Sequence, residues 1–271
     1  MFDAHMLFTI LMYLALGVGA GITAGLFGIG GGLLIVPVLV FSFGLQGISP
    51  DVLTHAAVAT SLATIVFTSI SSIKAHHDRG AVRWPVFKPL AVGIAIGAIL
   101  GAFTADQIKG PHLQIIIGVF AIVIGLQMWF NLKPKGGTEL PGKAGLTGAG
   151  GVIGWASAIF GIGGGSLSVP FLTWKSMPMQ QAVATSAACG LPIALMGAIT
   201  NIYTGWQSPE MPEWSLGYIY LPAFIGIVMS SAYCARIGAK WAHSLPGDKL
   251  KRIFAVFLFL VGVRFLLANL L

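Results

Sequence analysis

Two glycine-rich segments hold the residues best suited to bind a ligand. Residues 25–37 read GLFGIGGGLLIVP and residues 158–170 read AIFGIGGGSLSVP, so that Phe27 and Phe160 are 133 positions apart (160 − 27). A helix that begins at such a run presents unpaired backbone N–H groups and the positive end of its dipole. Because glycine lets the backbone approach an oxyanion closely, each segment predicts an anion-binding helix N-terminus that needs no charged side chain.

The glycines of both segments are therefore predicted to bind the substrate. In a membrane, irregular glycine backbone is tolerated only where it is buried in protein or lines a wet cavity. Close packing between helices is the alternative explanation, but the repetition of the whole segment favours a shared site. The glycines predicted to bind substrate are Gly28, Gly30, Gly31, Gly32, Gly161, Gly163, Gly164 and Gly165.

A second repeat adds hydroxyl groups to this hypothesis. Residues 57–61 (AVATS) recur as residues 182–186, an offset of 125 (182 − 57). Hydroxyls in apolar helices bond to their own helix, to a neighbouring helix or to a ligand. The aromatic rings beside the glycines are either hydrophobic gates or packing residues. The further substrate-binding candidates are Thr60, Ser61, Thr185, Ser186, Phe27 and Phe160.

Composition indicates the class of protein. Of the 271 residues, 56% are hydrophobic and 8% are charged, and the mean hydropathy is +0.89; a soluble domain carries about 25% charged residues. Apolar runs of roughly 20 residues predict membrane-spanning helices and exclude an outer-membrane barrel. The net charge of +7 comes mainly from Lys and Arg between these runs, which fits control of membrane topology and argues against nucleic-acid binding.

The predicted fold class is all-α, a polytopic membrane protein. The first glycine segment divides a long apolar run at 6–43 into two helices that meet at residues 28–32. The other predicted helices span 55–73, 86–105, 112–132, 146–160, 166–174, 181–203, 218–237 and 253–271.

The repeats divide the chain into two halves of about four to five helical segments each. Residues 1–135 form the first transmembrane repeat, 136–143 a cytoplasmic linker and 144–271 the second repeat. After the AVATS helix, the first half carries Lys74 and Arg79 in its loop, and the second half carries acidic residues. Basic loops stay in the cytoplasm, so the halves are predicted to be inverted, with both chain ends outside and broken helices or re-entrant segments meeting near the membrane midplane.

The titratable residues argue against several chemistries. All eight Asp and Glu residues fall at loop or terminal positions, which disfavours a cation carrier or a carboxylate proton relay. No Ser/His/Asp, Cys/His or paired-carboxylate set falls on matched positions, so the chain is predicted not to be an enzyme and to use no metal or cofactor. Arg264 is either an anion-attracting group or a snorkelling cation, and His55 is either a proton-coupling group or an interfacial structural residue.

The two glycine segments and the two AVATS segments resemble those of the TauE/SafE sulfite exporter family, also described as sulfonate-uptake permease-like transporters. The resemblance covers nearly the whole chain. It implies a multi-pass carrier in the cell inner (cytoplasmic) membrane for a small sulfur-containing anion such as sulfite, a sulfonate, sulfoacetate or thiosulfate.

Alternating access around a midplane site, in the direction of export, is the expected mode of action. An inside-negative voltage favours anion exit by roughly 2.3 kcal/mol per charge per 100 mV. An anion channel and an ion-coupled uptake permease are the alternatives. The expected partners are the small anionic substrate and the lipid bilayer, with no nucleic acid, and homo-oligomer formation is left open.

Overall fold

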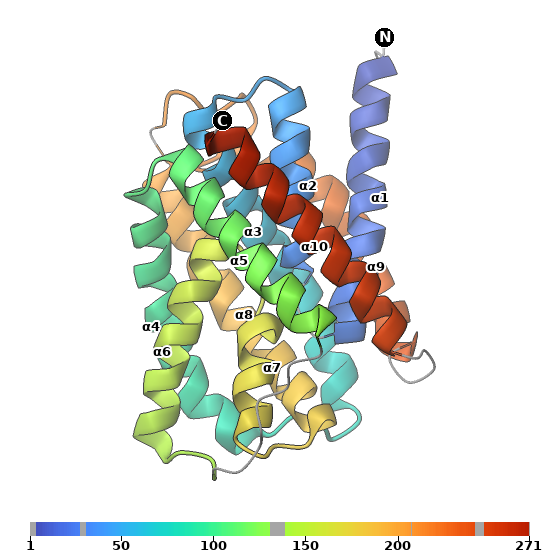
Figure 1. Cartoon of the computed structure of the whole chain (residues 1–271), viewed down its shortest axis with the longest axis vertical. Coiled ribbons are helices and arrows are strands. Elements are labelled where there is room, and N and C mark those ends of the chain that lie inside the picture. The colour runs from blue at the N-terminus through green and yellow to red at the C-terminus, as the bar shows by residue number, and fades with distance from the viewer. Residues whose placement is uncertain (1–3, 28–30, 131–138, 207, 242–246, 271) are drawn as a thin grey trace.

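The computed structural model describes residues 4–27, 31–130, 139–206, 208–241 and 247–270, and most of these residues are helical (Figure 1). Two short antiparallel strands, β1 (Ser215–Leu216) and β2 (Ile219–Tyr220), form a hairpin. The helices are α1 (Ala4–Phe27), α2 (Gly32–Leu45), α3 (Pro50–His77), α4 (Trp84–Asp106), α5 (Gly110–Trp129), α6 (Lys143–Phe160), α7 (Gly165–Trp174), α8 (Met179–Thr204), α9 (Leu221–Trp241) and α10 (Gly247–Leu270).

Several helices have the length and surface of membrane spans. Within the described ranges, α3, α4, α5 and α8 are long and apolar enough to cross a membrane, and α1, α2, α9 and α10 contain shorter apolar stretches. Large exposed apolar side chains on α4 recur every three or four residues and so share one helix face. They are Val92, Ile96, Leu100 and Phe103. The predicted all-α polytopic membrane class is confirmed.

Several predicted helix boundaries differ from the observed ones. α3 is longer than the predicted 55–73, because Pro50 suits the first helical turn and Lys74 and His77 in the last turn interact favourably with the helix dipole. The segment predicted to be helical from residue 218 begins instead with the hairpin, whose turn contains Gly217 at φ +58°. Part of the predicted linker lies outside the described residues, and the division into 1–135, 136–143 and 144–271 stays a prediction.

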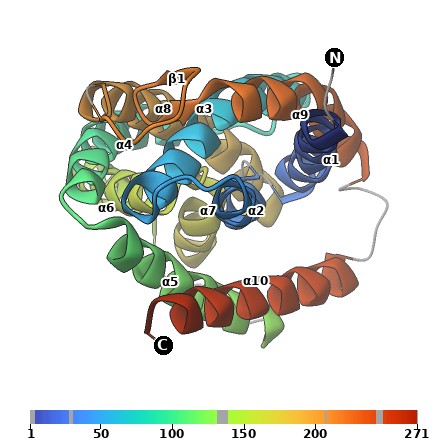
Figure 2. The same ribbon diagram turned by 90° about the horizontal axis from the view of Figure 1, so that it is seen from above.

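The main helix contacts join one half of the chain to the other. α1 packs along α9, α4 along α6, α5 along α10 and α3 along α8. Figure 2 shows α2 and α7 towards the centre of the bundle, with α5 and α10 together along one side. The helices α1 to α5 of the first half correspond in order to α6 to α10 of the second half. When each helix is replaced by its counterpart, the α1–α9 pair becomes the α6–α4 pair, and the α3–α8 and α5–α10 pairs are unchanged. Inverted repeats would give this pattern, and the inversion itself stays a prediction.

Glycines let several of these pairs approach to backbone contact. On α4, Gly97 faces the carbonyl oxygen of Gly151 on α6, and a β-carbon at this position would overlap that oxygen. On α1, Gly17 faces the Ile227 carbonyl of α9 in the same way. Small residues at such interfaces are the usual means by which helices associate in lipid, where burial of apolar surface gives little driving force.

A hydrogen bond fastens the β-hairpin to the end of α4, and a ring stack places it against the first turns of α3. The Tyr218 hydroxyl donates to an Asp106 carboxylate oxygen at 3.1 Å. Burial, and then the Asp106 charge, raise the pKa of Tyr218 to about 12, so the hydroxyl stays a donor. The Tyr218 ring stacks on His55 with ring centroids 5.3 Å apart. Both ring nitrogens of His55 lie 3.1 Å from backbone carbonyls, of Asp51 and Ala105, and a proton-coupling role for this residue stays a hypothesis.

We predict that Gly97→Ala destabilises the α4–α6 pair. The added methyl group has to displace the Gly151 carbonyl, at a cost of about 1–3 kcal/mol, which lowers the midpoint of thermal unfolding in detergent. Gly148→Ala on α6 is the control, because nothing lies within 4 Å of its β-carbon position. Equal unfolding midpoints for the two variants would contradict this account of the packing.

Candidate functional site

The two glycine segments touch each other inside the molecule. Gly32, the first residue of α2, packs against the Gly161 carbonyl and the Cα of Ile162. A β-carbon at Gly32 would lie 2.8 Å from that Cα, and all three residues are buried. The turn that ends α6 therefore lies against the start of α2, so the two copies of the glycine repeat are in direct contact.

The turn that ends α6 requires glycine. Gly161 has φ +65°, and the amides of Gly161 and Ile162 donate to the carbonyls of Ala158 (3.4 Å) and Ser157 (3.0 Å). This pair of bonds is the Schellman ending of a helix, in which left-handed backbone favours glycine. A β-carbon at Gly161 would also lie 2.8 Å from Val36 Cγ2. Backbone conformation and the close contact with α2 both exclude a larger residue.

Both helices that leave the glycine segments begin without a side-chain cap. α2 follows Gly31 (φ +76°) and α7 follows Gly164 (φ −58°), and glycine has no side chain to accept from the first-turn amides. Within the described residues, the amides of Gly164 and Gly165 donate to no backbone carbonyl. Residues 161–166 are buried. A buried helix N-terminus of this kind leaves N–H groups and positive dipole available to a small anion.

The threonines of the AVATS repeat join the two halves. The Thr60 hydroxyl accepts a hydrogen bond from the Tyr220 amide, immediately before α9, at 3.0 Å. The Thr185 hydroxyl accepts from the Arg83 amide, immediately before α4, also at 3.0 Å. Both threonines are fully buried. Each bond ties a central helix of one half to the start of a helix in the other, and a substrate role for these hydroxyls stays a prediction.

The two serines of the repeat have different surroundings. Ser61 Oγ donates to the Gly161 carbonyl at 2.8 Å and so fixes the turn after α6 to α3. Ser186 is fully buried, and its hydroxyl has no hydrogen-bond partner in the described part of the chain. The Ser186 carbonyl lies 2.6 Å from the β-carbon position of Gly164, so α8 packs directly against the start of α7. A buried unpaired hydroxyl, on a residue whose backbone packs against uncapped amides, is a candidate donor to a ligand.

The remaining candidates are placed as follows. Gly163 is buried beside Gly164. The Phe160 ring stacks on Phe120 of α5 with centroids 3.8 Å apart, which supports packing rather than an open gate. Arg264 is exposed on α10, with its guanidinium 5.6 Å from the centre of an aromatic ring of α2, and is not among the buried residues of the site. Outside the described residues lie Gly28, Gly30 and the side chain of Phe27.

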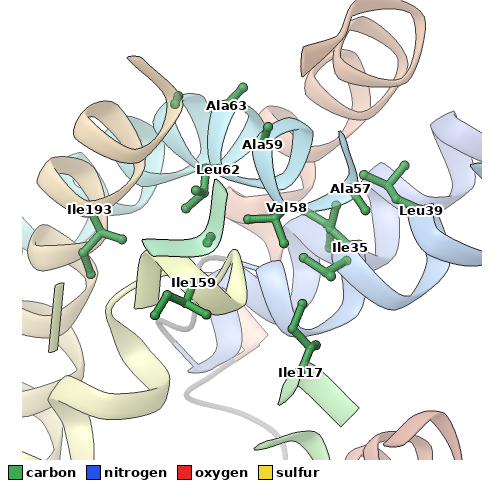
Figure 3. Packing of buried hydrophobic residues seen from close by; sticks show 14 of the residues in the cluster. Ile35, Leu39, Ala57, Val58, Ala59, Leu62, Ala63, Ile117, Ile159 and Ile193 are labelled. Carbon is green, nitrogen blue, oxygen red and sulfur yellow. The ribbon is translucent and has the colours of Figure 1, made fainter. Parts of the chain in front are cut away.

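Apolar side chains from four helices surround the meeting point. Figure 3 shows Val58 and Leu62 of α3 among Ile35 of α2, Ile159 of α6 and Ile193 of α8. All five are buried. Hydrogen bonds in such surroundings are stronger than in water, because the local dielectric constant is low. The hydrogen bonds at the site therefore hold its polar groups firmly in position.

Three serines beside the second glycine segment were not predicted. Ser157 near the end of α6, and Ser166 and Ser168 at the start of α7, are buried. No partner for the Ser157 and Ser166 hydroxyls is found among the described residues, and Ser168 lies within hydrogen-bonding reach of the Cys189 thiol on α8. The sequence does contain a signal for two of them. Ser166 and Ser168 stand where the first copy of the repeat has Leu33 and Ile35.

The fold and the site define a polytopic α-helical membrane protein in which the start of α2 meets the glycine turn after α6 in the interior. The family model for the sulfite exporter TauE/SafE matches residues 13–265, so the chain belongs to this family of membrane transporters. The resemblance noted in the sequence is confirmed.

Relatives of nearly the same length support this assignment. A probable membrane transporter protein of Haemophilus influenzae is 38% identical over 263 residues, which cover 95% of this chain and 98% of that protein. A probable membrane transporter protein of Methanocaldococcus jannaschii is 28% identical over 264 residues, or 96% and 97% of the two chains. The Bacillus subtilis protein YunE, also a probable membrane transporter, is 25% identical over 268 residues, or 91% and 93%. No solved structure gives a significant match.

We predict that Ser61→Ala lowers the stability of the folded protein. The variant leaves the buried Gly161 carbonyl without its donor, which costs about 1–3 kcal/mol and lowers the thermal unfolding midpoint in detergent. Thr173→Ala on α7 is the control, because the Thr173 hydroxyl bonds only to carbonyls of its own helix. If Ser61→Ala unfolds at the wild-type temperature, this bond does not hold the turn.

Proposed function

We propose that the chain is a secondary transporter, and not an enzyme, that moves a small sulfur-containing anion across the cytoplasmic (inner) membrane. The observation that carries the proposal is the buried contact of Gly32 with Gly161 and Ile162, at which α2 and α7 both begin with uncapped amides. Membership of a transporter family supports transport. Two helix N-termini support an anion as the cargo.

Alternating access is the mode of action that best fits this arrangement. Helices that begin inside a membrane protein, one in each half, are typical of transporters built from inverted repeats. The Thr60–Tyr220 and Thr185–Arg83 bonds occupy equivalent places in the two halves. A movement that lengthens one of these bonds and keeps the other would open the site towards one side of the membrane at a time.

The proposed cargo is an anion of the sulfite class, and the proposed direction is export. Sulfite carries one or two negative charges near neutral pH and offers three oxygens to hydrogen-bond donors. All carboxylates of the chain fall at loop or terminal positions in the sequence, which favours an anion over a cation as cargo. An inside-negative voltage assists anion exit by roughly 2.3 kcal/mol per charge per 100 mV, so export needs no coupling ion.

We expect Gly31→Val and Gly164→Val to reduce sulfite flux about tenfold or more while the protein still inserts into the membrane. Valine at Gly31 would have to adopt φ +76°, which is strained for a β-branched residue. Valine at Gly164 would place its β-carbon 2.6 Å from the Ser186 carbonyl. The measurement is release of sulfite from loaded proteoliposomes under an imposed voltage, with Gly148→Val as the control.

The outcomes separate the proposal from its alternatives. Saturable flux of one sulfur oxyanion supports the carrier, and its dependence on an imposed ion gradient would identify coupled uptake. Rapid currents of many anions without saturation indicate a channel. Normal flux in either well-folded glycine variant contradicts the glycine site, and the absence of any anion flux through folded wild-type protein contradicts the transporter proposal.

A further inference from the structure

The side chains that follow the two glycine segments differ in polarity. Ser166 and Ser168 of α7 correspond, by the offset of 133 residues, to Leu33 and Ile35 of α2. All four are buried, and the Ser166 hydroxyl has no hydrogen-bond partner among the described residues, whereas Ser168 lies within hydrogen-bonding reach of the Cys189 thiol. Leaving a buried hydroxyl unpaired costs about 1–3 kcal/mol. An unpaired hydroxyl at the second segment, where the first has an apolar side chain, indicates a ligand at the second segment.

Residues of three elements lie close together at the start of α7. Gly190 of α8 has no side chain, and the place that its β-carbon would occupy lies 2.9 Å from Ser69 Oγ on α3. The same place lies 3.5 Å from the backbone nitrogen of Gly164. Ser69 is only 3% exposed. A hydroxyl and an uncapped amide therefore adjoin a position that any side chain at residue 190 would fill.

The equivalent place at the first glycine segment is already filled. By the offset of 125 residues, Gly190 corresponds to Ile65 and Ser69 corresponds to Ala194. Ile65 is fully buried, and its Cδ1 lies 3.0 Å from the β-carbon position of Gly32. The first segment thus has an isoleucine and an alanine where the second has a bare glycine and a serine. The repeat is symmetric in its backbone pattern and asymmetric in its polar groups.

Resting on the proposed function, we infer that the anion binds at one site, in front of Gly190, to the Gly164 amide and the Ser69 hydroxyl. The hydroxyls of Ser166 and Ser186 supply further donors. These groups are neutral, and the positive end of α7 offsets the charge of the ligand. The site takes a compact oxyanion with several acceptor oxygens. The first glycine segment instead packs its backbone at Gly32 against the turn that ends α6.

The test combines sulfite binding and sulfite flux in the full-length protein. Ser69→Ala removes one donor without adding volume and raises the half-saturating sulfite concentration about tenfold or more, as expected for a hydrogen bond to a charged ligand. Gly190→Ala places a methyl group against Ser69 Oγ and the Gly164 amide and abolishes saturable flux. Sulfite-dependent stabilisation against heat in detergent gives a second readout that needs no transport.

Matched controls use the same substitutions on the same helices. Ser71→Ala on α3 removes a hydroxyl that bonds to the Ala232 carbonyl at 3.2 Å. Gly197→Ala on α8 meets only the flexible side chain of Leu62. Both controls are expected to keep the wild-type sulfite dependence.

The possible results distinguish the two claims. Wild-type flux that saturates, together with unchanged half-saturation in Ser69→Ala and Gly190→Ala, overturns the single-site inference and leaves the transporter proposal standing. Folded wild-type protein that shows neither flux nor stabilisation with sulfite, sulfate or thiosulfate overturns both. Loss of saturation in Gly190→Ala with normal thermal stability supports the inference.

Discussion

Backbone contact between the start of α2 and the turn that ends α6 fixes the arrangement of the interior of this protein. Gly32 lies against Gly161 and Ile162 at a distance that leaves no room for a β-carbon. The Ser61 hydroxyl holds the same turn from α3. Because a helix from each half starts at this place, the helix ends, the apolar core around them and the bonds between the halves all have to be arranged about it.

Much of the fold could be predicted because membrane helices depend on local properties. A run of apolar residues must satisfy its backbone within itself, so its length and its glycine breaks give the helices and the paired short segments. The β-hairpin could not be found in this way, since each of its strands has two residues and its turn depends on Gly217. Which helices pair across the halves is equally absent from local pattern, because it is decided by contacts such as that of Gly97 with α6.

The candidate site was predictable in its backbone and less so in its side chains. The repeated glycines pointed to helix N-termini, and those described, at Gly32 and Gly165, are buried starts of helices. The AVATS repeat suggested four similar hydroxyls, yet the Thr60 hydroxyl pairs with the amide of Tyr220, 160 residues away in the sequence. Ser61 is hydrogen-bonded and its counterpart Ser186 is not. Such differences arise from long-range contacts, which a repeat in one sequence does not reveal.

The pairing of α1 with α9 has a consequence for the synthesis of the protein. α9 begins 194 residues after α1 ends (221 − 27). At about 5–20 residues per second, a ribosome needs roughly 10–40 s to produce the missing partner. During that interval Gly17 and Gly21, which in the folded protein lie against the α9 backbone, have no α9 to contact. The first half has to wait in an unfinished state, shielded by lipid or by the insertion machinery, until the second half emerges and completes it.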